Sequence, residues 1–184
     1  MRRWILLLAI IGTCSLPLHA QDVIFGTKQG NISFFSKAPL EDIDAKNDKV
    51  TSLLNTSNNE VAVRVPIHEF QFRNKLMQEH FNENYMESEK YPYATFKGKV
   101  NETIDFGKPG NYDVSATGVL NIHGVNQKRT LTGKLQITET NMVLDTKFEV
   151  LLKDHKIKIP TLVFNKIAEK IAVHTNFNLT AQAK

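Results

Sequence analysis

Two stretches of this chain decide its fold: EHFNENYMESEKYPYATF, at Glu79–Phe96, and GVLNIHGV, at Gly118–Val125. The first passes from helix-like spacing into a strand at Tyr91-Pro92, because proline is tolerated at the first residue of a strand. The second is an alternating strand that ends at His123-Gly124, which is a turn signal. Neither stretch looks like catalytic machinery. Both have the character of joints between the elements of a small β-barrel.

Outside these joints, apolar residues recur at every second position. Such alternation is typical of antiparallel strands with one apolar face and one wet face. About eight to ten strands fit along the chain, which favours a closed barrel or a sandwich. A barrel of about eight strands has an interior just wide enough for side chains or for one small ligand. The clearest runs are Val61, Val63, Val65 and Ile67; Tyr112, Val114, Ala116, Gly118, Leu120 and Ile122; Met142, Leu144, Thr146, Phe148, Val150 and Leu152; and Ile171, Val173, Thr175, Phe177 and Leu179.

One segment departs from this alternation. From Ile67 to about Met86 the apolar residues fall at helical spacing, directly after Pro66, which suits the start of a helix. We therefore predict a mainly all-β fold, an antiparallel barrel of about eight strands, with one inserted helix near residues 67–86.

Several features mark less regular places. Gly118 and Gly133 interrupt strong strands and predict a bulge or a bend at a barrel corner. A second short helix is expected near Leu162–Glu169. Further strands are expected near residues 22–27, 30–36, 40–46 and 49–54.

The N-terminus has the layout of a secretory signal peptide. Two arginines precede the apolar run Trp4–Ile11, and Ala20 supplies a small residue for cleavage. The run is too short to span a bilayer, which takes about 20 apolar residues. The alternative is a lipoprotein with Cys14 as the lipidated residue. We predict a signal peptide at residues 1–20 and one exported domain at residues 21–184.

Composition narrows the function of the exported part. Cleavage removes the only cysteine, so neither disulfide nor thiol chemistry is expected there. The formal charge of +4 falls to +2 because two arginines leave with the signal peptide. No basic run marks a polyanion site, so nucleic acid is not expected as a partner. No linker or repeat divides the chain, which favours a single domain.

Alternation of this period also fits a membrane-spanning barrel, whose outer face is apolar and whose lumen is polar. The helical insertion, the lack of paired aromatic girdles and the polar ending Thr180–Lys184 favour the opposite orientation, with an apolar interior. We therefore predict no integral membrane insertion and an apolar occupant for any space inside. The charged residues expected on the outer face include Lys97, Lys99, Asp145, Lys147 and Glu149.

The two joints also carry a family resemblance. Glu79–Phe96, with its acidic-His-Phe start, resembles the segment after the helix in the YceI family, and Gly118–Val125 resembles that family's hairpin. The similarity in layout covers nearly all of Gln21–Lys184. Supporting motifs are Lys90-Tyr91-Pro92, Ala94-Thr95-Phe96, Arg129-Thr130-Leu131 and the late segments Phe148–Leu152 and Ile171–Leu179.

The resemblance implies a periplasmic, lipocalin-like barrel whose tunnel holds a polyisoprenoid chain or a comparable lipid. Two segments, Asp22–Leu54 and Asp154–Lys170, depart from the family's pattern. They would form one end of the barrel, so the departure implies a tunnel that is shortened, closed or reshaped there.

The apolar strand face supplies the candidate ligand-binding residues. Two interpretations stay open, a filled core and the wall of a ligand tunnel, because any sheet interior uses these residue types. The helix residues would form a lid or end wall, or else belong to the core. The candidates are Phe34, Phe96, Leu120, Ile122, Phe148, Val150, Phe177 and Leu179 on the strands, and Phe70, Met77 and Phe81 on the helix.

Other chemistry has little support in the sequence. The five histidines of the exported part include no i, i+2 or i, i+4 pair of metal ligands. There is no Gly-x-Ser-x-Gly elbow and no phosphate-cradling glycine loop. We predict no metal, no cofactor and no enzymatic activity. His123 is expected to make a backbone hydrogen bond in its turn.

The leading hypothesis is an exported protein that holds a long apolar ligand, an isoprenoid quinone or a polyprenyl lipid. The alternative is a non-binding structural or protein-interaction barrel of the cell envelope. A hydrolase or isomerase would need a cluster of titratable groups inside the barrel, and the sequence supplies none. Homodimer formation is left open.

Overall fold

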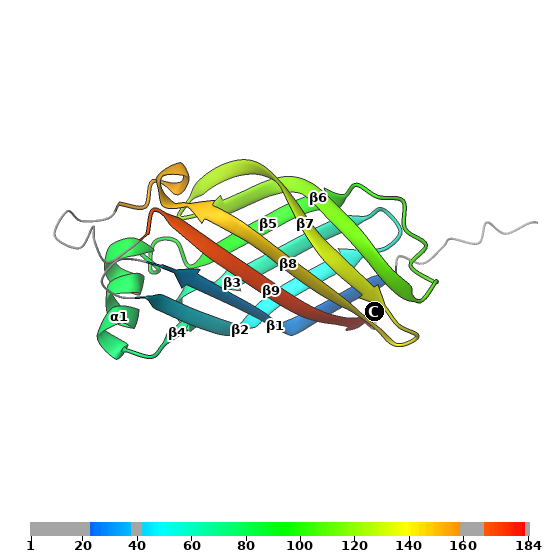
Figure 1. The fold of residues 1–184 in the computed structure, drawn as a ribbon, viewed down its shortest axis with the longest axis horizontal. Helices are drawn as coiled ribbons and strands as arrows, with labels where there is room; N and C mark the ends of the chain where they lie inside the picture. Colours follow the sequence, from blue (N-terminus) through cyan, green and yellow to red (C-terminus); the bar gives the residue numbers. More distant parts are fainter. Residues whose placement is uncertain (1–22, 38–41, 159–167, 183–184) are drawn as a thin grey trace, which may run out of the picture.

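The computed structural model describes residues 23–37, 42–158 and 168–182. Eight antiparallel strands close into an elongated barrel in the order β1-β9-β8-β7-β6-β5-β3-β2, with β2 pairing back to β1 (Figure 1). This confirms the predicted fold class. The barrel strands are β1 (Ile24–Ser36), β2 (Ile43–Asn55), β3 (Glu60–Pro66), β5 (Tyr93–Val100), β6 (Gly110–Ile122), β7 (Val125–Ile137), β8 (Asn141–Leu151) and β9 (Lys170–Ala181).

Some predicted features fall outside the described residues. They are the signal peptide at residues 1–20, Cys14, and most of the helix expected near Leu162–Glu169.

The first two strands differ from the prediction. The strands expected near 22–27 and 30–36 form one strand, β1, and those expected near 40–46 and 49–54 belong to one strand, β2. The register of β1 against β2 shifts between Thr27 and Ile32, so a bulge interrupts the alternation where the sequence suggested a break. Both strands have 13 residues, as β6 and β7 do. The pair therefore runs along the barrel and is not confined to one end.

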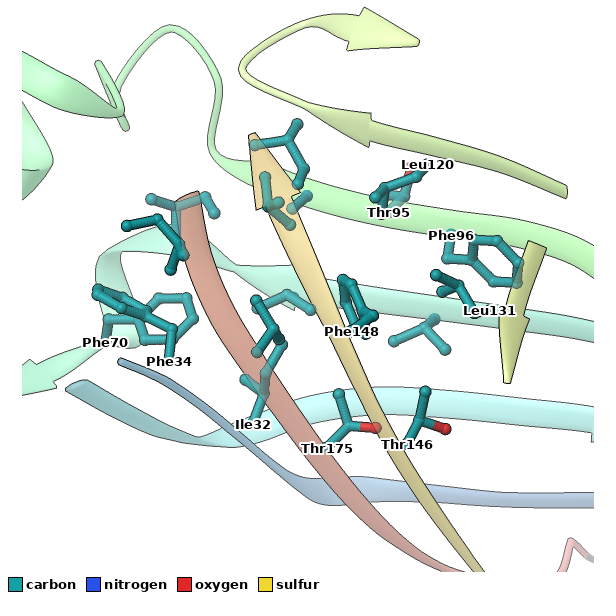
Figure 2. A pocket seen from close by; sticks show the side chains of 18 of the residues that line it. Ile32, Phe34, Phe70, Thr95, Phe96, Leu120, Leu131, Thr146, Phe148 and Thr175 are labelled. Atoms are coloured by element: carbon teal, nitrogen blue, oxygen red, sulfur yellow. The ribbon is translucent and has the colours of Figure 1, made fainter. Parts of the chain in front are cut away.

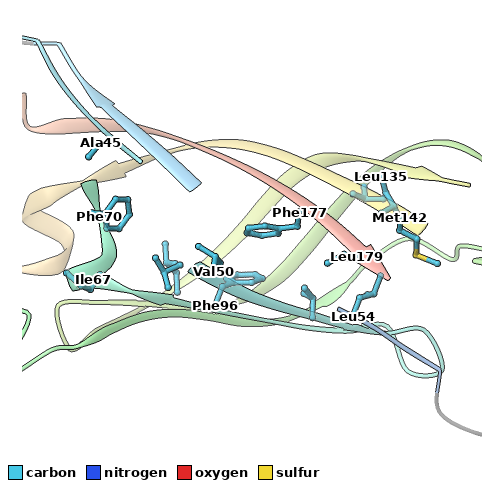
Figure 3. Packing of buried hydrophobic residues seen from close by; sticks show 14 of the residues in the cluster. Ala45, Val50, Leu54, Ile67, Phe70, Phe96, Leu135, Met142, Phe177 and Leu179 are labelled. Atoms are coloured by element: carbon cyan, nitrogen blue, oxygen red, sulfur yellow. The ribbon is translucent and has the colours of Figure 1, made fainter. Parts of the chain in front are cut away.

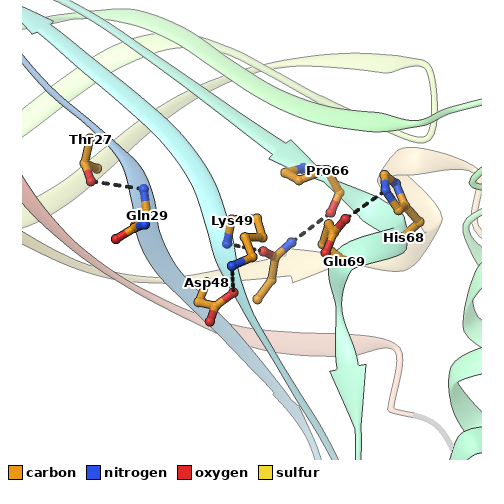
Figure 4. Close-up of polar contacts among 8 residues, drawn as sticks. Thr27, Gln29, Asp48, Lys49, Pro66, His68 and Glu69 are labelled. Atoms are coloured by element: carbon orange, nitrogen blue, oxygen red, sulfur yellow. Dashed lines mark hydrogen bonds and ion pairs between the residues drawn. The ribbon is translucent and has the colours of Figure 1, made fainter.

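Several polar groups at this irregular part of the sheet are satisfied locally (Figure 4), whereas Ser52 Oγ, paired opposite Thr27, is buried without a partner in the described residues. Thr27 Oγ1 accepts a hydrogen bond from Gln29 N at 3.1 Å, and Asn47 Oδ1 accepts one from Lys49 N at 2.8 Å. Asn47 Nδ2 donates to Pro66 O at 2.8 Å, beyond the last β2–β3 ladder pair. Since Asn47 is almost fully buried, these bonds also remove the penalty of an unpaired amide.

Gly118 and Gly133 do not mark bulges, contrary to one of the two predicted readings. The β5–β6 ladder runs through Gly118 and the β6–β7 ladder runs through both glycines without a register shift, whereas the β7–β8 ladder ends at Gly133, which pairs with Thr146. Gly118 pairs with Gly98, and a Cβ on Gly118 would lie 2.2 Å from Lys97 O and 2.4 Å from the Gly98 Cα. The two facing glycines therefore allow β5 and β6 to approach more closely than side chains would permit.

The inserted helix is shorter than the predicted span of residues 67–86. Pro66 is extended and ends β3, and Asn74 caps the helix by accepting hydrogen bonds from the N–H groups of Leu76 and Met77. The apolar residues of this span lie at helical spacing in the sequence because their side chains all point toward one end of the barrel. They do so from several short elements and not from one long helix. These elements are the 3₁₀ turn η1 (Ile67–Glu69), β4 (Gln71–Phe72), α1 (Lys75–His80) and the π-helical turn η2 (Phe81–Tyr85).

The two stretches quoted at the outset meet in space. His123 has a φ of 52° in the β6–β7 turn, and its Nε2 lies 2.7 Å from Glu87 Oε2. The His123 ring packs edge-on against Tyr91 at 4.5 Å between centroids. Gly124, with φ of 72°, packs against the Tyr91 ring, and a Cβ at this position would lie only 2.5 Å from that ring.

The electrostatics of this joint follow from its geometry. The hydrogen bond from His123 lowers the pKa of Glu87. His123 Nδ1 also lies 3.2 Å from His155 O in the 3₁₀ turn η3 (Leu152–His155), so the backbone partner of His123 lies in a distant segment and not in its own turn as predicted.

The barrel interior is filled at the end near the β7–β8 hairpin. Met142 and Leu179 face each other in the β8–β9 ladder, and their exposed fractions are 1% and 0%. Ile137, the ladder partner of Met142 on β7, is 4% exposed. Figure 3 shows Met142 and Leu179 far from Phe70, which lies at the α1 end. We call Ile137, Met142 and Leu179 the packed end.

Candidate ligand-binding cavity

A cavity of about 250 Å³ lies inside the barrel (Figure 2). All eight barrel strands contribute to its lining, and it reaches from Met77 in α1 to Leu135 beside the packed end. An apolar cavity of roughly 150 Å³ is already large enough to hold benzene. The interior is therefore not a solid core over this length.

Alternation identified the wall of this cavity well. Ten of the eleven candidate residues line it, seven from the strands and three from the helical end. Leu179 does not, because it lies in the packed end with no exposed surface. The ten are Phe34, Phe70, Met77, Phe81, Phe96, Leu120, Ile122, Phe148, Val150 and Phe177.

Four phenylalanines close the cavity at its α1 end. Phe34 on β1 packs against Phe70, Phe72 and Phe81, with ring centroids 5.3, 5.8 and 5.6 Å away. Phe81 also lies 5.5 Å from Phe70 and 5.0 Å from Phe72. Aromatic rings at such separations attract one another beyond their apolar burial. We call this set the aromatic wall.

Phe72 is the member of the aromatic wall that the sequence did not single out. It lies on β4, whose two residues are too few to show any alternation. Its pairing with Ala45 on β2 turns its side chain toward Phe34. Only the cluster of three nearby phenylalanines in the sequence, Phe70, Phe72 and Phe81, could have suggested it.

Polar groups in the lining are few and uncharged. Among the described residues that line the cavity, none is Lys, Arg, Asp, Glu or His. Six of the described lining residues carry a hydroxyl: Ser36, Tyr85, Thr95, Ser115, Thr146 and Thr175. Of these, Ser36, Thr146 and Thr175 are buried. The sequence placed Thr146 and Thr175 on the apolar face by alternation but did not identify them as site residues.

The charged residues predicted on the outer face lie there. Lys97, Lys99, Lys147 and Glu149 are exposed, and Asp145 is half-buried. His174 Nε2 lies 2.7 Å from Asp145 Oδ2, and this hydrogen bond lowers the pKa of Asp145. Within residues 23–37, 42–158 and 168–182 there is no cluster of potential metal ligands.

One histidine is wholly buried beside the cavity. His155 in η3 has no exposed surface, and burial lowers its pKa, which keeps the imidazole neutral. Its Nδ1 lies 3.3 Å from Val125 O, while its Nε2 has no hydrogen-bond partner in the described part of the chain. His155 thus joins η3 to the start of β7.

The closed antiparallel barrel and its apolar cavity define a lipocalin-like β-barrel. A family model described as a YceI-like domain matches residues 23–179. The chain therefore belongs to the YceI family, as the two joints predicted. The match includes nearly all of Asp22–Leu54 and all of Asp154–Lys170, the segments that looked divergent.

Solved structures share this fold at low sequence identity. A polyisoprenoid-binding domain from Saccharophagus degradans, implicated in plant cell wall breakdown, is 16% identical with a TM-score of 0.72, over 88% of this chain and 100% of that one. BcnA of Burkholderia cenocepacia is 13% identical with a TM-score of 0.67, over 81% and 95%. The YceI protein of Campylobacter jejuni is 15% identical with a TM-score of 0.63, over 80% and 90%.

No curated protein sequence matches this chain. Among the helices of the described residues, none has the length and apolar character needed to cross a membrane.

Proposed function

We propose that this protein is exported to the periplasm and holds one long apolar molecule, an isoprenoid quinone or a polyprenyl lipid, inside its barrel. The observation that carries the proposal is the cavity, which is continuous, almost entirely apolar and lined by every strand of the barrel. A barrel with only a structural role would be more stable if side chains filled this space, because a closely packed interior is more stable than one with a cavity.

The energetics of such a site are adequate without charged contacts. Each buried CH₂ contributes about 0.8 kcal/mol, so roughly ten buried carbons outweigh the lower estimates of the association cost, about 4 kcal/mol. Affinity then comes from apolar area. This is why a binding role leaves no motif of reactive residues in the sequence.

Two further observations support the proposal. One structural neighbour is a polyisoprenoid-binding domain, and it shares the same barrel. The N-terminal layout of a charged start, the apolar run Trp4–Ile11 and Ala20 fits export. We assign the protein a binding role and no catalytic one.

Extraction of the protein from its native host tests this directly. The purified protein is extracted with organic solvent, and the extract is analysed by mass spectrometry for co-purified lipid. We expect a stoichiometric long-chain isoprenoid compound. A lipid-free extract, together with no binding of added prenyl lipids, would contradict the proposal and favour the non-binding envelope barrel.

Export is tested separately. Fractionation of the host cell and N-terminal sequencing should place the mature protein in the periplasm, beginning at Gln21. A mature chain that begins at Cys14 and partitions with membranes would instead identify the lipoprotein alternative.

A further inference from the structure

Two threonine side chains stand next to each other in the middle of the cavity wall. Thr146 on β8 pairs with Thr175 on β9 in the antiparallel ladder, and both line the cavity (Figure 2). Side chains at such a directly opposed pair have Cβ atoms about 5 Å apart. The exposed fractions of Thr146 and Thr175 are 9% and 6%, so both are shielded from bulk water.

No hydrogen bond joins Thr146 Oγ1 or Thr175 Oγ1 to another group in the described residues. Two other hydroxyls of the lining are engaged: Ser36 Oγ accepts a hydrogen bond from Ala168 N at 3.0 Å, and Ser115 Oγ donates one to Glu102 Oε1 at 2.6 Å. A buried hydroxyl without a partner is unfavourable relative to a hydrogen-bonded one. The pair therefore offers two free hydrogen-bonding groups to whatever fills the cavity.

The strand next to Thr146 leaves room beside this pair. Gly133 on β7 pairs with Thr146, and a Cβ on Gly133 would lie 2.7 Å from Thr146 Oγ1 and 2.5 Å from Asp145 O. The glycine that interrupts β7 thus keeps the space next to the Thr146 hydroxyl open. Gly133 itself lines the cavity.

The surroundings determine which chemical group could use these hydroxyls. The described lining residues carry no charged side chain, so a phosphate at this depth would lack a counter-charge and keep its full desolvation penalty. A neutral carbonyl or ether oxygen needs only a donor, which a threonine hydroxyl supplies.

We infer that Thr146 and Thr175 form a polar anchor that hydrogen-bonds a neutral oxygen of the ligand in the middle of the barrel. The anchor selects an oxygenated apolar ligand, such as one with a quinone-type ring, over a plain hydrocarbon and over a chain that carries phosphate. This inference rests on the proposed function and specifies the class of its ligand.

Matched probes test the anchor on the full mature chain after removal of bound lipid. The probes are decyl-1,4-benzoquinone, decylbenzene and decyl phosphate, which share one chain and differ in the head. Calorimetry gives the dissociation constant of each. We expect wild type to bind the quinone about tenfold more tightly than decylbenzene, and decyl phosphate most weakly.

Variants then distinguish the contribution of the two hydroxyls to binding from the contribution of the shape of the cavity wall. Thr146→Val with Thr175→Val should weaken quinone binding about tenfold and leave decylbenzene within about twofold. Thr175→Ser keeps a hydroxyl and should retain the quinone preference. Thr132→Val, on the exposed face of β7, is the matched control and should change neither constant.

The outcomes distinguish this inference from the proposed function. If decylbenzene and the quinone bind equally and the double variant weakens neither selectively, the anchor is wrong but the lipid-binding proposal stands. Tighter binding of decyl phosphate than of the quinone also overturns the anchor. If none of the three probes binds wild type, both proposals fail.

Discussion

The two ends of the barrel interior are built from the same alternating pattern but are filled differently. At the packed end, Ile137, Met142 and Leu179 leave almost no exposed surface. Toward α1, the same period continues through Phe148 and Val150 on β8, yet these residues line a cavity of about 250 Å³. The difference shows that alternation defines which way a side chain points, while its neighbours across the barrel define whether space is left.

The ends also differ in what holds them together. The packed end is purely apolar, whereas the cavity end is closed by the aromatic wall and by polar joints at His123 and His155. Apolar packing does not respond to pH, whereas the lowered pKa values of His155 and Glu87 make stability depend on pH. The cavity end should therefore be the part of the barrel that opens first and the part that acidification loosens.

The largest expected effect is on packing. Leu179→Ala removes a side chain with no exposed surface and should lower the free energy of unfolding by about 2–5 kcal/mol. The same change at Leu131, a half-buried residue of the cavity wall, should lower it by about 1 kcal/mol or less, because space is already present there. Urea unfolding measures both. Equal losses at the two positions would mean that the cavity is filled in solution.

The second prediction fills the cavity. Ala116→Phe places a ring in the lined space and should weaken binding of an isoprenoid probe more than about tenfold, with little loss of stability. Val119→Phe, on the exposed face of the same strand, is the matched control and should bind as wild type does. Titration calorimetry and thermal unfolding give the two quantities. Unchanged binding by Ala116→Phe would place the ligand elsewhere.

The third prediction concerns His155. Burial lowers its pKa below the ordinary 6.5, so the unfolded chain binds a proton at pH values where the folded chain does not. Stability should therefore fall as the pH drops below about 6.5, and His155→Leu should flatten this part of the profile. Hydrogen exchange should show faster exchange in η3 and at the start of β7 while the packed end stays protected. A profile that keeps its slope in His155→Leu contradicts the assignment.

The smallest effect is expected at Glu87. Its pKa is lowered from 4.5 by the hydrogen bond with His123, so the stabilisation is present at neutral pH and is lost as the pH falls through the lowered value. Glu87→Gln should remove this acid-side dependence. Since Glu87 is partly exposed, the change should be small and should weaken with added salt. Glu83→Gln, on the preceding turn, serves as the control.

Much of the cavity lining could be predicted from the sequence, and each failure has a physical reason. Alternation chose seven of the candidates that line the cavity, and helical spacing chose three more. Alternation failed at Leu179 because period 2 gives a side chain's direction and not its position along the barrel axis. It missed Phe72 because a two-residue strand has no period. It did not identify the threonine pair, because only the folded structure shows whether a hydroxyl on an apolar face has a hydrogen-bond partner.

The sequence by itself determined the antiparallel strands, the inward face and the two joints, Glu79–Phe96 and Gly118–Val125. These depend on local spacing, on turn chemistry and on glycine. Only the tertiary structure decided that β1 closes on β2 across a bulge, that one end is filled and the other hollow, and that Thr146 faces Thr175. Those features depend on how strands distant in sequence are staggered against one another, and no single segment carries that information.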